Sequence, residues 1–110
     1  MPFRAILETL VHGNTPAVRG AIFCDNEGER VDACCGDVDP FTLDVTGATF
    51  AATACSMQRG QRMRVAVGDE VLWIVMVDEG YYLVVFCRPG LDMTCKAAFP
   101  GIADALAAYM

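Results

Sequence analysis

Apolar positions along this chain repeat with two different periods, and each period predicts one kind of element. Residues 2–13 repeat apolar side chains at the spacing of one buried helical face, at Phe3, Ile6, Leu7, Leu10 and Val11. Residues 18–25 and 29–36 are strand-like, and the turn sequence Asp-Asn-Glu-Gly separates them. The first third of the chain therefore predicts a helix followed by a β-hairpin.

A second helix is predicted over residues 39–60, and it carries two apolar stripes. Asp39 suits the N-cap, Pro40 the first helical position and Gly60 the stop. The first stripe contains Phe41, Val45, Ala48, Ala52 and Cys55, and the second, roughly opposite, contains Leu43, Phe50, Ala54 and Met57. A helix that covers one face of a small domain needs one stripe, so the other predicts deeper burial or contact with a partner.

Three strands are predicted next, over residues 61–67, 71–77 and 81–87. The first alternates apolar residues with arginines, whereas the other two are apolar throughout, as is typical of strands covered on both faces. The short turns Gly-Asp-Glu and Asp-Glu-Gly between them predict an antiparallel meander. Such a sheet needs helices on both faces, and residues 91–110 supply a further helical pattern with a kink or a new start expected at Pro100.

The meander provides a sheet surface for one stripe of the helix over residues 39–60. Ala48 and Ala52 are small enough for close approach, so we expect the stripe that contains Phe41 to face the sheet. The stripe that contains Leu43 is then left for a symmetry mate or another partner. Periodicity alone also allows the opposite orientation.

Composition narrows the function classes. The chain has 110 residues, which predicts a single domain over residues 1–110, and its net charge of −6 argues against nucleic acid or an anionic membrane as the main partner. An apolar fraction of 55% is high for a small domain and favours an oligomer. No apolar run reaches membrane-spanning length and the start lacks the order of a secretory signal, so we expect a cytoplasmic protein with no membrane insertion.

Candidate chemistry is sparse. The six cysteines contain no C-x-x-C pair and the single histidine, His12, is far from them in sequence, so we expect free, packed thiols and no metal or cofactor. No catalytic motif is present, which argues against an enzyme. Arg59, Arg62 and Arg64 could present an arginine finger to a nucleotide enzyme, but a charged helix end and edge strand is the favoured interpretation.

Three segments and their order resemble the roadblock family, which includes dynein light chains and bacterial gliding-motility regulators. They are ILETLV, PAVRGAIFCDNEGERV and LWIVMVDEGYYLVVFC, within the order α-β-β-α-β-β-β-α. The resemblance implies an α+β, profilin-like sandwich with a five-stranded antiparallel sheet and helices on both faces. It also implies a prokaryotic, noncatalytic homodimer that pairs its third strands edge to edge, places its long helices side by side and binds a small Ras-like GTPase as an adaptor or regulator.

The expected dimer and partner interface combines the outer stripe of the long helix with the basic cluster and the edge strand. Its residues are Leu43, Phe50, Ala54, Met57, Arg59, Arg62, Met63, Arg64 and Val65. The alternative hypotheses are a signalling module that holds a small ligand between sheet and helices, and a redox-sensing dimer that uses Cys34, Cys35 or Cys55.

Overall fold

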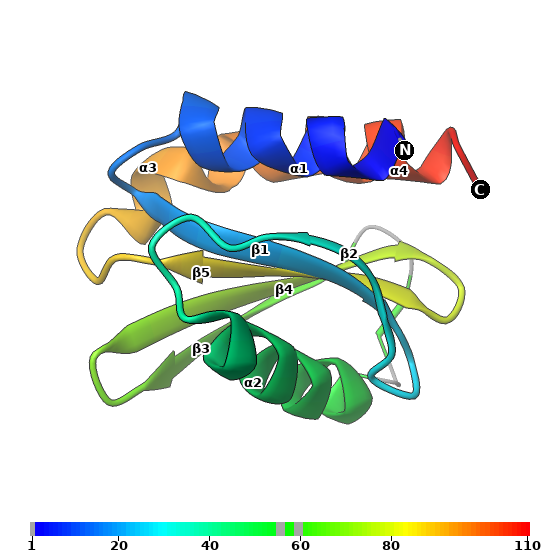
Figure 1. The fold of residues 1–110 in the computed structure, drawn as a ribbon, viewed down its shortest axis with the longest axis horizontal. Coiled ribbons are helices and arrows are strands. Elements are labelled where there is room, and N and C mark those ends of the chain that lie inside the picture. The colour runs from blue at the N-terminus through cyan, green and yellow to red at the C-terminus, as the bar shows by residue number, and fades with distance from the viewer. Residues whose placement is uncertain (1, 55–56, 59–60) are drawn as a thin grey trace.

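Helices pack on both faces of a five-stranded antiparallel sheet in the computed structural model, which describes residues 2–54, 57–58 and 61–110 (Figure 1). The helical elements are α1 (Pro2–Gly13), α2 (Pro40–Thr53), α3 (Asp92–Cys95), the 3₁₀ turn η1 (Lys96–Ala98) and α4 (Phe99–Ala107). The strands are β1 (Val18–Asp25), β2 (Arg30–Cys34), β3 (Arg62–Val67), β4 (Glu70–Asp78) and β5 (Tyr81–Cys87). The predicted α+β class and element order are confirmed.

The strands lie side by side in the order β2-β1-β5-β4-β3, and every pairing is antiparallel. The hairpins β1–β2, β3–β4 and β4–β5 join neighbours in sequence, whereas β1 pairs with β5 from the far end of the chain. This pairing leaves β2 and β3 as the two edges of the sheet.

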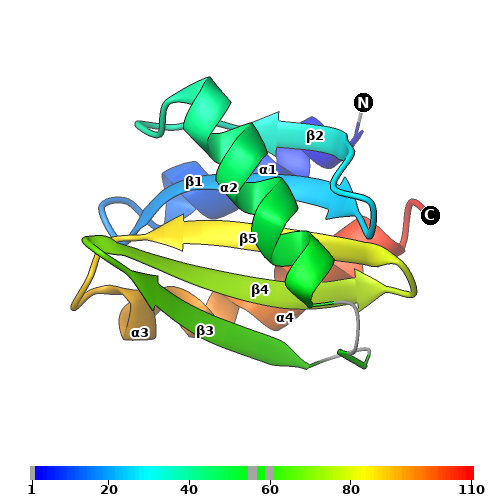
Figure 2. The same cartoon turned by 90° about the horizontal axis from the view of Figure 1, so that it is seen from below.

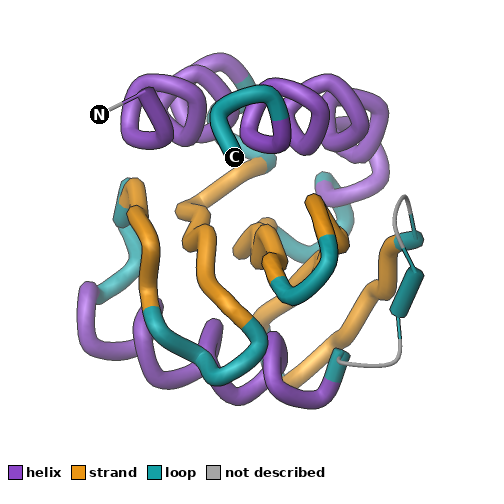
Figure 3. The backbone as a smooth tube through the Cα atoms, turned by 90° about the vertical axis from the view of Figure 1, so that its right-hand side faces the viewer, coloured by secondary structure: helices purple, strands orange, loops and turns teal. Residues whose placement is uncertain are grey.

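Each face of the sheet has its own apolar core because successive strand residues point to opposite sides. Phe23 packs in the cluster beneath α1 and α4, while its neighbour Ile22 packs in the cluster beneath α2. The same alternation separates Val85 from Val84 on β5. Seen along the sheet, the helices form one layer above and one below the strands (Figure 3).

The orientation of α2 is opposite to the one favoured from sequence. Leu43 and Ala54 are fully buried in the cluster beneath α2, and Met57 is buried there too, whereas Phe41 and Val45 are exposed. The prediction that the stripe with Phe41 faces the sheet is therefore wrong. Cys55, the last member of that stripe, lies outside the described residues.

Gly47 explains why α2 takes this orientation. It is buried, and a Cβ added to it would stand 2.6 Å from Cγ2 of Ile22 on β1. Without a side chain at this position the helix approaches the sheet closely, and Leu43 and Ala51 lie one turn before and after it on the same side. The size of the residue at the closest contact, and not the number of apolar residues in a stripe, decides which face of α2 packs on the sheet.

The helix is also shorter than predicted. Asp39 caps its start as expected, since its carboxylate accepts the backbone N–H of Thr42 at 3.0 Å. The helix ends at Thr53, with Ala54 as C-cap, and the backbone N–H of Met57 donates to the carbonyl of Ala54 at 3.0 Å. This turn brings the side chain of Met57 into the core beneath α2.

The C-terminal segment divides where the sequence predicted a break. Pro100 lies in the first turn of α4, where its missing N–H is tolerated, so the segment begins a new helix there. Phe99 and Leu106 are fully buried beneath this layer. Tyr109 lies beyond α4 and is exposed, with its ring centroid 6.5 Å from that of Phe3.

Candidate interaction surface

The strand β3 forms an open edge of the sheet with two chemically different faces. Met63 and Val65 lie opposite Ile74 and Leu72 of β4, which belong to the core beneath α2. Arg64 lies opposite Trp73, which belongs to the core beneath α1 and α4. The edge therefore carries apolar side chains toward the α2 side and arginines toward the other.

An exposed apolar stripe on α2 lies on the same side of the sheet as Met63. Phe41 is 75% exposed and Val45 49% exposed, and Met63 on β3 is 38% exposed. Figure 2 shows α2 crossing β1, β5 and β4, while β3 continues along the edge beyond it. Phe41 and Val45 lie on the first two turns of α2 and Met63 lies on β3, and all three are on the same side of the sheet. We call this side the α2/β3 face.

The predicted interface residues divide into two groups. Leu43, Phe50, Ala54 and Met57 all belong to or pack against the core beneath α2, so the first group turns inward. Arg62, Met63, Arg64 and Val65 come together on β3, and Arg59 lies outside the described residues. Phe41 and Val45 take the outward position that the sequence assigned to the first group. The signal that identifies them is Gly47, which marks the inward side of α2.

A buried carboxylate anchors β3 to α3. Asp92 is 1% exposed and accepts from the Arg64 guanidinium, with Nε to Oδ2 at 2.6 Å and Nη2 to Oδ1 at 3.3 Å. The indole N–H of Trp73 also donates to Asp92, at 3.1 Å. The Arg64 hydrogen bonds lower the pKa of Asp92 most, burial opposes them, and the Trp73 bond adds to the lowering.

This anchor assigns a structural role to Arg64. A guanidinium that makes two hydrogen bonds to a buried carboxylate is held within its own protomer. Arg62, two residues earlier on the same strand, donates to the backbone carbonyl of Lys96 at 3.3 Å. Both contacts favour the interpretation of a charged edge strand over an arginine finger.

The anchor predicts how stability depends on pH. Because Arg64 holds the folded pKa of Asp92 below its unfolded value of about 3.9, the ion pair stabilises the fold above that pH and is lost as pH falls through the folded pKa. We expect the R64M substitution to lower the urea midpoint at pH 7 and to differ progressively less from the unsubstituted protein as pH falls below 4. Circular dichroism during urea titration measures this difference.

The R62M substitution is the matched control, because Arg62 is an exposed arginine of the same strand. It should leave the midpoint nearly unchanged over the same pH range. If the urea midpoints of the R64M variant and the unsubstituted protein differ by the same amount at pH 7 and pH 3, the structural role assigned to the Arg64–Asp92 pair is contradicted.

The five cysteines within the described residues divide into packed thiols and one partly accessible thiol. Burial raises the pKa of Cys24 to about 12 and also raises the pKa values of Cys34, Cys87 and Cys95. A raised pKa lowers the thiolate fraction and with it the rate of oxidation. Cys35 is half-buried. These environments give little support to redox sensing through Cys34.

The described residues offer few groupings of metal-ligating side chains. His12 Nε2 lies 4.0 Å from Sγ of Cys34. In the part of the chain that the structure describes, no group of three or more His, Cys, Asp or Glu side chains is placed to hold a metal ion. Of the described helices, none combines the length and apolar character that crossing a membrane requires.

Comparison with solved structures identifies the architecture. MglB of Myxococcus xanthus matches with a TM-score of 0.79 at 13% identity, over 97% of this chain and 93% of that chain. A roadblock/LC7 domain from Streptomyces avermitilis matches with a TM-score of 0.71 at 15% identity, over 96% of this chain and 94% of that chain. The chain has the roadblock fold.

The gliding protein MglB of Thermus thermophilus has the same roadblock fold, with a TM-score of 0.77 at 21% identity over 94% of this chain and 84% of that chain. No protein-family model matches the sequence, and no curated protein matches it. The resemblance drawn from the three sequence segments is thus confirmed for the roadblock fold.

Proposed function

We propose that this protein is a noncatalytic homodimeric adaptor or regulator of a small Ras-like GTPase, acting in the cytoplasm of a prokaryote. The observation that carries the proposal is the α2/β3 face, where an exposed apolar stripe on a helix and an open strand edge lie on the same side of the sheet. On a roadblock fold, the resemblance noted from sequence implies that these two elements form the dimer.

In the proposed dimer, the β3 edges of two protomers pair and extend the sheet across both. The unpaired backbone groups of an edge strand favour such an addition. The two copies of α2 then lie side by side, and Phe41, Val45 and Met63 become buried between protomers. Of the residues expected from sequence, those of β3 remain in the proposed interface: Arg62, Met63, Arg64 and Val65. Leu43, Phe50, Ala54 and Met57 support it from within the protomer.

The GTPase is proposed as the second partner because the roadblock resemblance includes bacterial gliding-motility regulators. Two of the similar structures are MglB proteins, and the one from Thermus thermophilus is described as a gliding protein. A dimer with paired long helices offers one continuous surface to such a partner. The commitment of Arg64 to Asp92 supports a role in binding over one as an arginine finger.

The proposal is tested by affinity capture with the purified protein as bait, followed by nucleotide turnover. Bait is incubated with native cell extract in the presence of GDP or of a nonhydrolysable GTP analogue, and the retained proteins are identified. We expect a Ras-like GTPase that is retained with one nucleotide and not the other. The purified GTPase is then assayed with and without this protein. A regulator should change the rate of GTP hydrolysis or nucleotide exchange, whereas an adaptor should bind stably and leave both rates unchanged. Retention of no GTPase with either nucleotide contradicts the proposal.

A further inference from the structure

The two open edges of the sheet, β2 and β3, differ in regularity. An edge strand exposes unpaired backbone N–H and C=O groups to which another strand can add. β3 has six residues, and its register with β4 runs from Arg62 to Val67 without a break. β2 has five residues, and its register with β1 shifts between Phe23 and Cys24, where Val31 of β2 opposes no residue of β1. The β2 edge is therefore the shorter and the less regular of the two.

The backbone N–H of Ala33 on β2 points to this open edge. In an antiparallel sheet, successive residues direct their backbone groups alternately to one neighbouring strand and to the other. The N–H of Asn26, just beyond β1, donates to the carbonyl of Gly80, directly before β5. Ile22, four residues earlier, directs its backbone groups to that same side, away from its β2 partner Ala33. Ala33 therefore directs its own N–H away from β1, toward the open edge.

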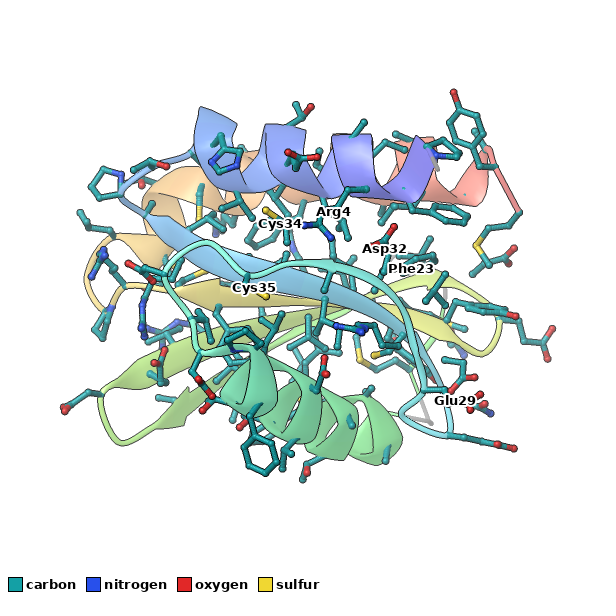
Figure 4. All side chains as sticks on the ribbon, viewed as in Figure 1. Arg4, Phe23, Glu29, Asp32, Cys34 and Cys35 are labelled. Atoms are coloured by element: carbon teal, nitrogen blue, oxygen red, sulfur yellow. The ribbon has the colours of Figure 1, made fainter. Side chains whose placement is uncertain are left out.

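The carboxylate of Asp32 caps this N–H. Its Oδ1 accepts a hydrogen bond from the backbone nitrogen of Ala33 at 2.8 Å. Nη1 of Arg4, on α1, lies 3.7 Å from the same oxygen, and Figure 4 shows Arg4 and Asp32 next to each other beneath α1. A hydrogen bond to an ionised carboxylate is stronger than one between neutral groups. The N–H that an added strand would need is thus already paired within the protomer.

β3 carries no comparable cap. Among the residues that the structure describes, the backbone N–H groups that donate to carboxylates belong to turns, to α2 and to β2, and none belongs to β3. The carbonyl of Gln61, just before β3, accepts from the N–H of Met76 on β4. By the same alternation, Arg62, Arg64 and Ala66 direct their backbone groups to the open edge. The edge of the proposed dimer is thus open, and the opposite edge is capped.

We propose that Asp32 determines which edge of the sheet takes part in assembly. It caps the N–H of Ala33, Arg4 holds its carboxylate in place, and strand addition at β2 is blocked. Two self-complementary edges on one protomer would join copies into an open chain and not a closed dimer, so one edge has to be blocked. The capping of β2 stands on its own contacts, and only the choice of β3 as the pairing edge rests on the proposed function.

The D32A and D32N variants form a matched pair that tests the cap. Both remove one negative charge and the ion pair with Arg4, but the side-chain amide oxygen of the D32N variant can still accept from the N–H of Ala33. Amide hydrogen exchange followed by NMR measures the protection of this N–H, corrected for the intrinsic rate of each sequence. We expect about tenfold lower protection in the D32A variant and a change of less than about threefold in the D32N variant.

The opened edge should also cause association. The F41D substitution places a charge in the proposed dimer contact, so it supplies a background in which β2 is the edge that is tested. At about 500 μM protein, we expect the D32A/F41D variant to sediment with about twice the mass of the F41D variant, and the D32N/F41D variant to match the F41D variant. Circular dichroism establishes that each variant is folded before its mass is measured.

The R4M variant guards against a folding defect in the D32A variant. It leaves Asp32 in place but frees the carboxylate to turn toward water, so protection of the Ala33 N–H should fall about threefold.

Three results would overturn the proposal. The first is unchanged protection of the Ala33 N–H in the D32A variant or, if that variant does not fold, in the R4M variant. The second is no increase in mass on adding D32A to the F41D variant, and the third is an equal increase on adding D32N. Neither measurement involves a GTPase or a nucleotide, and both concern β2, so failure here is distinct from failure of the proposed function.

Discussion

The F41D variant is expected to sediment as a monomer at concentrations where the unsubstituted protein forms the proposed dimer. Phe41 is the most exposed large apolar side chain of α2, and large aromatic residues at the centre of an interface often dominate its binding energy. A carboxylate there would be buried against the partner without a cation. We expect the dimer dissociation constant to rise about 100-fold, which corresponds to about 3 kcal/mol. Sedimentation velocity over a dilution series measures it.

The protomer should tolerate this change, which separates an interface defect from unfolding. Phe41 lies in the first turn of α2, where a negative charge is favoured by the helix dipole, so the urea midpoint of the diluted variant should hold or rise slightly. The V31D variant makes the same kind of substitution on the opposite edge strand and should remain dimeric. A dimer of unchanged affinity in the F41D variant would remove the α2/β3 face from the interface.

The L43A variant is expected to lose about 3 kcal/mol of unfolding free energy, a large share of the 5–15 kcal/mol typical of a domain. Leu43 is fully buried beneath α2, so its truncation removes apolar contacts and leaves a cavity. Urea denaturation monitored by circular dichroism measures the loss. The V45A variant is the control, because Val45 lies on the same helix and is half exposed. It should change the protomer by less than about 0.5 kcal/mol.

This pair of variants also tests the orientation of α2 directly. If V45A proves the more destabilising of the two, the helix packs with the face that the sequence first suggested. The measurements should be made at concentrations below the dimer dissociation constant, since dimerisation adds stability that depends on protein concentration.

The strands and the first helix were predictable because their patterns are local. The bounds of α1, β1 and β5 agree with the prediction, since Pro2, Gly13 and the acidic turns mark the ends clearly. The apolar runs of β4 and β5 also predicted a sheet covered on both faces. These features depend on periodicity and turn residues, which neighbouring residues in the sequence determine.

The orientation and the end of α2 depended on contacts with distant residues. Both stripes are apolar, and the deciding contact is between Gly47 and Ile22, which lie on different elements. The sequence offers no stop signal before Gly60, yet the helix ends at Thr53, and Met57 is buried in the core beneath α2. The periodicity of apolar residues predicts which positions share a face of the helix, but it does not indicate where the helix must approach the sheet most closely.

The link between Arg64 and Asp92 was invisible for the same reason. The two residues are distant in the sequence, and neither position interrupts a periodic pattern. From sequence, Arg64 was interpreted as one of three exposed arginines. In the structure it is bound to a carboxylate that is almost fully buried. The buried charge pair appears only when β3 and α3 are placed side by side.

The position of Asp92 also has a consequence for synthesis on the ribosome. β3 is made before β5, and the sheet cannot close until β5 inserts between β1 and β4. Pairing between such distant segments is slow, so β3 is present as an incomplete edge during synthesis. Arg64 has no carboxylate partner until α3 has been made, so its charge is unpaired while the sheet is still open. In the proposed dimer, the completed β3 edge therefore becomes available only in finished protomers.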